Sequence, residues 1–328
     1  MTHKGWHWLV AVVVFVSLCI LAVSTGPIPI GARDVLRAVL GNGEQSVVAI
    51  VRNLRLPRVA LAALVGAGLG MSGGALQGSL RNGLAEPYLL GVSGGAAVGA
   101  VAALAFGITA AVGVALAAFV GATLAVLLAL VVARAAGRGS RGDPRTLLMA
   151  GVVIGAFANA VIMIALANAP ANTIRGALWW MMGSAGDATW PAVAALTAAI
   201  VIGGAALLAL ARDIDVLSLG EEPAAALGVN VDRSGRAVFL VSAMLAGATV
   251  AAAGLVGFVG LIVPHIVRAG GIRQHRALLT GAALVGASLV VAADLAARTL
   301  RPPAELPLGA VTAVLGVPFF LSQLRRAT

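Results

Sequence analysis

The chain has 328 residues, of which 60% are hydrophobic and only 10% are charged, and its mean hydropathy is +1.03. Soluble domains are about 45–50% apolar and about 25% charged, so the composition excludes a soluble protein and indicates an all-α integral membrane protein. The formal charge of +10 does not indicate a nucleic-acid partner. The basic residues are dispersed at the ends of apolar stretches, as in the loops of membrane proteins.

Eight uncharged windows follow one another along the chain: 5–32, 59–80, 87–133, 146–174, 188–211, 237–267, 277–293 and 306–324. A crossing helix needs about 20 residues, so six windows hold one crossing each. Window 87–133 has room for two crossings, with a turn near Phe106–Gly107. The first window is interpreted as a retained helix, because no clean small-residue cleavage site follows its apolar core.

Window 237–267 decides the topology. If it crosses twice, the inside loops hold 14 basic residues and the outside loops hold 8, whereas a single crossing gives 11 and 11. The positive-inside rule favours two crossings, hence ten transmembrane helices in one domain over 1–328, with both termini in the cytoplasm. The second of these crossings is short, and the glycine-rich break before it must be buried, because irregular backbone at membrane depth needs protein or water around it.

The cytoplasmic loop 212–236 is predicted to contain a short helix outside the membrane. Pro223 suits a first helical turn, so the helix begins near Gly220 and places Glu221 and Glu222 at the positive end of its dipole. Gly228 is a natural C-terminal stop. The small apolar face of this two-turn helix suits a groove on a partner.

The sequence offers few candidates for residues that hydrolyse ATP or bind a metal. The sequence has no G-x-x-x-x-G-K-[ST] phosphate loop, so we expect no ATP hydrolysis by this chain. The stretch MSGGALQG (Met71–Gly78) superficially resembles the ABC ATPase signature, but it lies inside an uncharged crossing and is interpreted as helix packing. Apart from the terminal pair His3 and His7, the histidines lack the spacing of metal ligands. His265 is expected to form a structural hydrogen bond at a helix end.

Charged residues near the outer side allow two interpretations. Asp294 lies four residues before Arg298, which favours an i,i+4 ion pair at the outer rim. Arg55 and Arg58 frame Pro57 at the mouth of the second helix. Arginine binds carboxylates through a rigid fork, so these arginines form either a carboxylate-binding site or a solvated, lipid-facing rim.

Several stretches together resemble one family, the permease subunits of ABC importers for ferric siderophores, haem and vitamin B12. The stretches occur in the family's order between residues 55 and 320: RLPR (55–58), SGGALQGSLRNGLAEPYLLGVSGGA (72–96), EEPAAALGV (221–229), AGLVGFVGLIVPHIVR (253–268), AADLAAR (292–298) and ELPLGAVTAVLGVPFF (305–320). The resemblance implies the type II importer fold, in which inverted pseudo-symmetry relates helices two to five to helices seven to ten. It also implies a homodimer, or a pair of homologous chains, with the substrate path between them.

The resemblance assigns roles to particular residues. EEPAAALGV matches the coupling helix that fits a cleft on the ATPase, with Glu221 and Glu222 at its start and a contact face of Ala225, Leu227 and Gly228. The outer arginines match those that receive glutamates from the substrate-binding protein: Arg55, Arg58 and Arg298.

Two further motifs are matched. Asn82 and Leu84 match the cytoplasmic gate loop, where Gly83 replaces the family's usual proline and gives a looser backbone. The remaining motif is an architectural signature in which glycines allow close packing and a proline shapes the short helix: Gly257, Gly260, Pro264 and His265.

The expected function is therefore that of a permease in the bacterial plasma (inner) membrane, carrying a ferric siderophore delivered by an extracytoplasmic binding protein. Two partner ABC ATPase subunits would hold ATP and magnesium, and no catalytic residue or cofactor is expected in this chain. Vitamin B12 and haem remain alternative substrates, and Gln77, Asn159 and Asn168 either line the path or bond neighbouring helices. An ion-coupled carrier would need an essential intramembrane carboxylate, and a membrane-embedded enzyme would need a His/Asp/Glu cluster at one depth.

Overall fold

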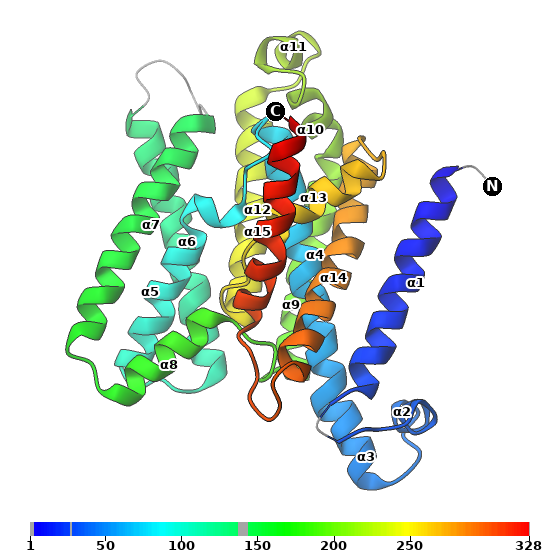
Figure 1. Ribbon diagram of the computed structural model, residues 1–328. Coiled ribbons are helices and arrows are strands. Elements are labelled where there is room, and N and C mark those ends of the chain that lie inside the picture. Colours follow the sequence, from blue (N-terminus) through cyan, green and yellow to red (C-terminus); the bar gives the residue numbers. More distant parts are fainter. Residues whose placement is uncertain (1–2, 27, 137–143, 328) are drawn as a thin grey trace.

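The computed structural model describes residues 3–26, 28–136 and 144–327, and every regular element in these ranges is helical (Figure 1). The helices are α1 (His3–Ser24), α2 (Ala32–Val39), α3 (Gln45–Ala49), α4 (Leu56–Ser79), α5 (Val92–Ala105), α6 (Ala111–Ala136), α7 (Pro144–Ala167), α8 (Ala171–Met182), α9 (Trp190–Ala209), α10 (Ala211–Leu217), α11 (Glu221–Ala226), α12 (Val231–Ala253), α13 (Val259–Ala269), α14 (His275–Thr299) and α15 (Leu308–Ala327). A π-helical turn, η1 (Ile50–Arg55), joins α3 to α4, and a 3-10 turn, η2 (Pro87–Leu90), precedes α5.

Seven stretches of the described chain are long and apolar enough to cross a membrane: Trp6–Ser24, Gln45–Ser79, Ala111–Ala135, Thr146–Ala167, Trp190–Ala209, Val231–Ala253 and His275–Thr299. Three shorter apolar helices stand where the sequence predicts the remaining crossings: Val92–Ala105, Val259–Ala269 and Leu308–Phe319. The integral membrane character is thus confirmed, while the count of ten crossings stays a prediction. The predicted turn is confirmed, since α5 ends at Ala105 and Gly107 has a φ of +79°.

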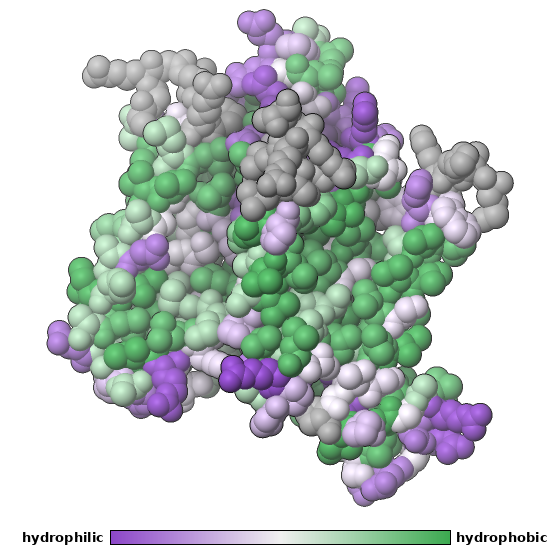
Figure 2. All heavy atoms as spheres, in the orientation of Figure 1, coloured by the Kyte–Doolittle hydropathy of each residue, from purple (hydrophilic) through white to green (hydrophobic). Residues whose placement is uncertain are grey.

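The bundle has two polar ends and an apolar middle (Figure 2). The N-terminal end of α1 and the C-terminal end of α15 lie at the same end of the bundle as α11, which we name the α11 end, while α2, α3 and α8 lie at the opposite end, which we name the α8 end (Figure 1). Termini on one side are what an even number of crossings produces.

Helix α4 lies at the centre of the larger part of the bundle, packed against α12, α13 and α14 (Figure 1). Its glycines bring backbones into contact. A Cβ atom added at Gly66 would lie 2.0 Å from the carbonyl oxygen of Gly286 on α14, and one added at Gly73 would lie 2.0 Å from that of Gly260 on α13. Such close approach is how small residues hold membrane helices together, and it confirms the interpretation of MSGGALQG as a packing segment.

The break predicted before the short helix is confirmed. Helix α12 ends at Ala253, α13 spans only eleven residues, and Phe258 between them has a φ of +68°. Two N–H groups of this break have side-chain acceptors: Val256 donates to Tyr88 Oη (3.0 Å) and Phe258 donates to Glu86 Oε1 (2.8 Å). Protein groups satisfy these two donors, as irregular backbone within a bilayer requires.

The two signature glycines beside the break differ. A Cβ atom at Gly260 would lie 2.9 Å from Pro87 Cδ and 3.1 Å from the Leu69 carbonyl oxygen, so this glycine does permit close packing. At Gly257 a Cβ atom would meet no other described residue within 4 Å. The expectation that Gly257 is needed for close packing is therefore wrong, because the chain at this position borders open space.

We expect Gly66→Ala to destabilise the bundle, because its new methyl group overlaps the backbone of α14, and overpacking of this kind costs about 1–3 kcal/mol. Gly155→Ala on α7 is the matched control, since its Cβ atom would meet nothing within 4 Å. Thermal unfolding in detergent measures both variants. Equal melting temperatures for the two variants would contradict the backbone contact.

Candidate coupling and docking sites

The predicted coupling helix is present as α11, which projects from the α11 end of the bundle (Figure 1). Gly220 is its N-cap residue with a φ of +125°, and Gly228 follows it with a φ of +81°. Both angles lie in the region where glycine is favoured. The predicted start and stop of the helix are therefore confirmed, with glycine at each end for a conformational reason.

The predicted contact face of α11 is open. Ala224 is the one buried residue of the helix, and the Leu227 side chain that follows it is 61% exposed. The remaining residues assigned to coupling are exposed as well: Glu221, Glu222, Ala225 and Gly228. Helix α11 therefore leaves the Leu227 side chain uncovered at this end of the protein.

The predicted gate loop is a tight turn that follows α4 at the same end. Asn82 Oδ1 accepts a hydrogen bond from the N–H of Leu84 (2.9 Å), and the Leu84 side chain is 50% exposed. Arg81 in this turn lies 3.9 Å from Glu221 of α11. The structure thus brings the predicted gate and the predicted coupling helix together, although their gating and coupling roles stay predictions.

Gly83, the departure from the family pattern, lies against His265. A Cβ atom at this glycine would lie 3.2 Å from His265 Nε2. The His265 ring is held from its other side, since its Nδ1 lies 2.8 Å from the carbonyl oxygen of Leu261 one helical turn earlier. The structural role expected for this histidine is confirmed, and Pro264 beside it is buried within α13.

Gln77 joins α4 to α13. Its Nε2 donates to the carbonyl oxygens of Gly260 (3.2 Å) and Leu261 (3.1 Å), and its Oε1 accepts from Arg268 Nη1 (2.6 Å). Of the two interpretations of Gln77, the bond between neighbouring helices is the one that the structure favours. Asn159 and Asn168 are both exposed on the outside of the described chain.

Two of the three predicted docking arginines, Arg55 and Arg298, are 5% and 8% exposed and bond to the end of α1. Their acceptors are carbonyl oxygens at or just beyond that end: Val23 (2.7 Å), Ser24 (3.0 Å) and Ile28 for Arg55, and Thr25 (3.0 Å) and Ala22 for Arg298. The last carbonyls of a helix have no intrahelical partner and favour positive charge. In this structure both arginines therefore cap α1.

Arg58 is the centre of an ion-pair network. Its guanidinium lies 2.9 Å from Asp294 and 2.7 Å from Glu305, and it donates two hydrogen bonds to each carboxylate. The predicted pair between Asp294 and Arg298 is also present at 3.5 Å. Asp294 is only 2% exposed, so this carboxylate is enclosed by protein, between arginines on α4 and α14.

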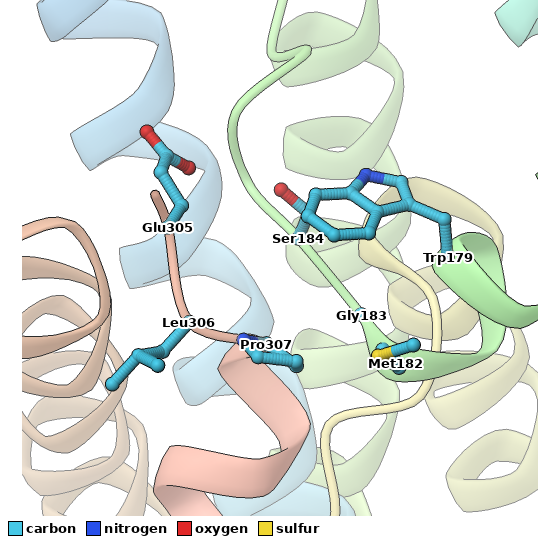
Figure 3. Close-up of a pocket in the computed structure, with 7 residues that line it drawn as sticks. All are labelled: Trp179, Met182, Gly183, Ser184, Glu305, Leu306 and Pro307. Atoms are coloured by element: carbon cyan, nitrogen blue, oxygen red, sulfur yellow. The ribbon is translucent and has the colours of Figure 1, made fainter. Parts of the chain in front are cut away.

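Glu305 is a partner of Arg58 that sequence reasoning did not find, because no spacing rule links it to an arginine 247 positions earlier. It also borders a small pocket at the α8 end, between the end of α8 and the loop before α15 (Figure 3). The lining residues are Trp179, Met182, Gly183, Ser184, Glu305, Leu306 and Pro307. The cavity volume of this pocket is about 10 Å³, roughly the space of one water molecule, so it is too small for a bulky substrate.

The described residues contain no group of three His, Cys, Asp or Glu side chains that could hold a metal ion.

The hydrogen bonds from Arg58 lower the pKa of Glu305 below its usual value of 4.5. A carboxylate with a lowered pKa stabilises the fold above its unfolded-state pKa, and this contribution disappears as the pH falls through the folded-state pKa. We expect the wild type to melt above Glu305→Gln at pH 7, and the difference to shrink as the pH falls from 4.5 through the lower folded-state pKa of Glu305. A difference that is the same at pH 7 and pH 3.5 would contradict the ion pair.

Comparison with known proteins gives a consistent result. The cobalamin import system permease BtuC of Halobacterium salinarum is 43% identical over 276 residues, which cover 84% of this chain and 73% of that protein. The hemin transport system permease HmuU of Yersinia pestis is 40% identical over 82% of this chain and 81% of its own. The Fe(3+)-citrate import system permease YfmE of Bacillus subtilis is 34% identical over 97% of this chain and 94% of its own.

The fold is also similar to that of a solved transporter. An inward-facing structure described as a metal-chelate type ABC transporter superposes with a TM-score of 0.87 and 26% identity, over 97% of this chain and 98% of the other. The model of the FecCD transport family matches residues 12–326. The chain therefore belongs to the FecCD transport family and is a multi-pass membrane permease of that family.

Proposed function

We propose that this chain is the permease subunit of an ATP-driven importer that moves a bulky metal chelate, brought by an extracytoplasmic binding protein, across the plasma (inner) membrane. ATP and magnesium are held by two partner ATPase subunits, since this sequence has no phosphate loop. A second permease chain, identical or homologous, completes the path. Both termini and α11 lie on the cytoplasmic side, and the end with α2, α3 and α8 faces outward.

The observation that carries this proposal is the exposed helix α11. It lies outside the apolar middle of the bundle (Figure 2). A glycine stands at each end of the helix, and the Leu227 side chain is exposed to solvent. A soluble ATPase can transmit its motion to a permease only through an element that projects from the membrane and is joined to the transmembrane helices. Helix α11 is such an element.

The proposed substrate class is taken from three relatives, which are named for cobalamin, hemin and Fe(3+)-citrate. All three are bulky metal chelates that differ in shape and charge. We propose a ferric siderophore or related ferric chelate as the substrate, with haem and cobalamin as the alternatives that a transport assay must separate.

An exposed apolar face supports contact with lipid and with a second permease chain. On α7 the side chains are 55–76% exposed: Met149, Val152, Val153, Phe157, Met163 and Ile164. Apolar surface on this scale is covered by hydrocarbon or by another protein.

Docking of the binding protein is proposed at the α8 end, with Arg58 as its centre. Arg55 and Arg298 donate their hydrogen bonds to α1, so a carboxylate of the binding protein would meet Arg58 most directly. The partner of Arg58 that an incoming carboxylate could replace is Glu305, which is 39% exposed, whereas Asp294 is buried.

An ion-coupled carrier is the competing function. It would need an intramembrane carboxylate that gains and loses a proton. Asp294 is the candidate, but it is already engaged in ion pairs with two arginines, Arg58 at 2.9 Å and Arg298 at 3.5 Å. The ion pairs therefore favour the importer.

We expect Leu227→Asp to prevent productive coupling to the ATPase, because a carboxylate cannot enter an apolar groove without losing its hydration. The complex is extracted from its own membranes in mild detergent, and the co-purifying chains are identified by mass spectrometry. The wild type should bring down an ABC ATPase, and the variant should lose the ATPase or the ATP-dependent transport.

Leu300→Asp is the matched control, because Leu300 is 69% exposed at the α8 end of the bundle. It should retain the ATPase. A wild type that purifies without any ATPase, under conditions that preserve such complexes, would contradict the proposed function. Equal transport by wild type and Leu227→Asp would remove α11 from the coupling role.

For the substrate, we expect cells that carry the complete importer to accumulate one radiolabelled chelate from a panel of ferric siderophores, ferric citrate, haem and cobalamin. The Leu227→Asp variant should lose this accumulation, as it should lose coupling to the ATPase. Uptake of cobalamin or haem alone would overturn the proposed ferric substrate but not the proposed importer function. If active complexes take up none of these compounds, metal chelates are excluded as the substrate class.

A further inference from the structure

The short helix α10 connects α9 to α11 and is bonded to two other helices through its aspartates. Asp213 Oδ2 accepts a hydrogen bond from Ser234 Oγ on α12 (2.5 Å). Asp215 Oδ1 accepts from the backbone N–H of His275 (2.9 Å) and lies 2.6 Å from its Nδ1. The first bond joins segments that are neighbours in the chain, whereas the second reaches a helix 60 residues away.

His275 is the first residue of α14, and its N-cap residue, Gln274, gives no side-chain cap. The N–H groups of a first helical turn have no intrahelical partner and favour negative charge. The carboxylate of Asp215, on α10, supplies both the hydrogen-bond acceptor and the negative charge. The histidine is 6% exposed, and because Nδ1 faces a carboxylate, the proton of the neutral ring is held at Nδ1.

The other side of the His275 ring rests on α4. A Cβ atom at Gly78 would lie 2.1 Å from His275 Nε2 and 2.7 Å from Ile214 Cγ2 of α10. Nε2 is buried without a hydrogen-bond partner in the described chain. Gly78 is the next-to-last residue of α4, directly before the turn that contains Asn82 and Leu84. Three helices therefore meet at one histidine, immediately behind the predicted gate.

We propose that Asp215 is a positioning residue for transport, which holds His275 so that movement of α11 and α10 is transmitted to the joined ends of α4 and α14. Because α4 and α14 are in backbone contact at Gly66 and Gly286, they move as a pair, and displacement at their common end reaches the gate turn. This inference rests on the proposed function and names the route by which the ATPase would act.

The test uses the complete complex with its own ATPase. Cys19 is the one cysteine of the chain, so Cys19→Ala combined with Leu84→Cys gives a permease with a single thiol in the gate turn. The rate at which a membrane-impermeant maleimide labels this thiol is measured without nucleotide and after trapping with ATP and vanadate. The wild-type background should show different rates in the two states.

Asp215→Ala should retain bound ATPase and basal ATP hydrolysis but lose the nucleotide-dependent difference in labelling. Asp215→Asn keeps an oxygen acceptor for both bonds and should restore most of that difference, which general loss of structure would not allow. Asp213→Ala is the matched control, because it removes the other aspartate of α10 and should leave the difference intact.

The outcomes separate the two proposals. If the labelling rate responds to nucleotide equally in the wild type and in Asp215→Ala, this inference alone is overturned. The same holds if Asp215→Ala loses its bound ATPase, or if Asp213→Ala and Asp215→Ala lose the labelling difference to the same extent. A wild type without bound ATPase, or without any response to nucleotide, would overturn the proposed function and this inference with it.

Discussion

The distance at which helices can approach α4 is the constraint on which the rest of the structure depends. Where Gly66 faces Gly286 and Gly73 faces Gly260, there is no room for a single carbon atom between the backbones. Lipid chains are as apolar as leucine, so membrane helices gain little from burying apolar surface and rely on close contact instead. The glycines of α4 supply that contact on two sides, and α13 is held close enough for Gln77 of α4 to bond to its backbone.

Much of this arrangement could be predicted from the sequence, because it follows from local rules. The ends of α11 were set by Gly220 and Gly228, the turn at Gly107 by the length of its apolar window, and the break before α13 by its glycines. Each depends on a few neighbouring residues whose conformational preferences are known. The structural hydrogen bond of His265 was equally local, since its acceptor lies one helical turn away.

The rest could not be predicted, because it depends on residues that are far apart in the chain. Nothing in the sequence indicates that Arg55 and Arg298 meet the same helix end, that Arg58 has Glu305 as a partner, or that Asp215 reaches His275. Gly257 and Gly260 look alike in sequence, yet only the second faces another backbone. These distant contacts fix how the helices lie against one another, which no local preference determines.

The capping of α1 also has a consequence for biosynthesis. Arg55 lies about 30 residues after its acceptors, whereas Arg298 lies 273 and 276 residues after its own. At roughly 5–20 residues per second, the ribosome reaches the second arginine between roughly 15 and 55 seconds after the first helix has been made. During that interval the nascent α1 has one of its two caps, so its attachment to α14 through Arg298 forms only after the intervening helices have been made.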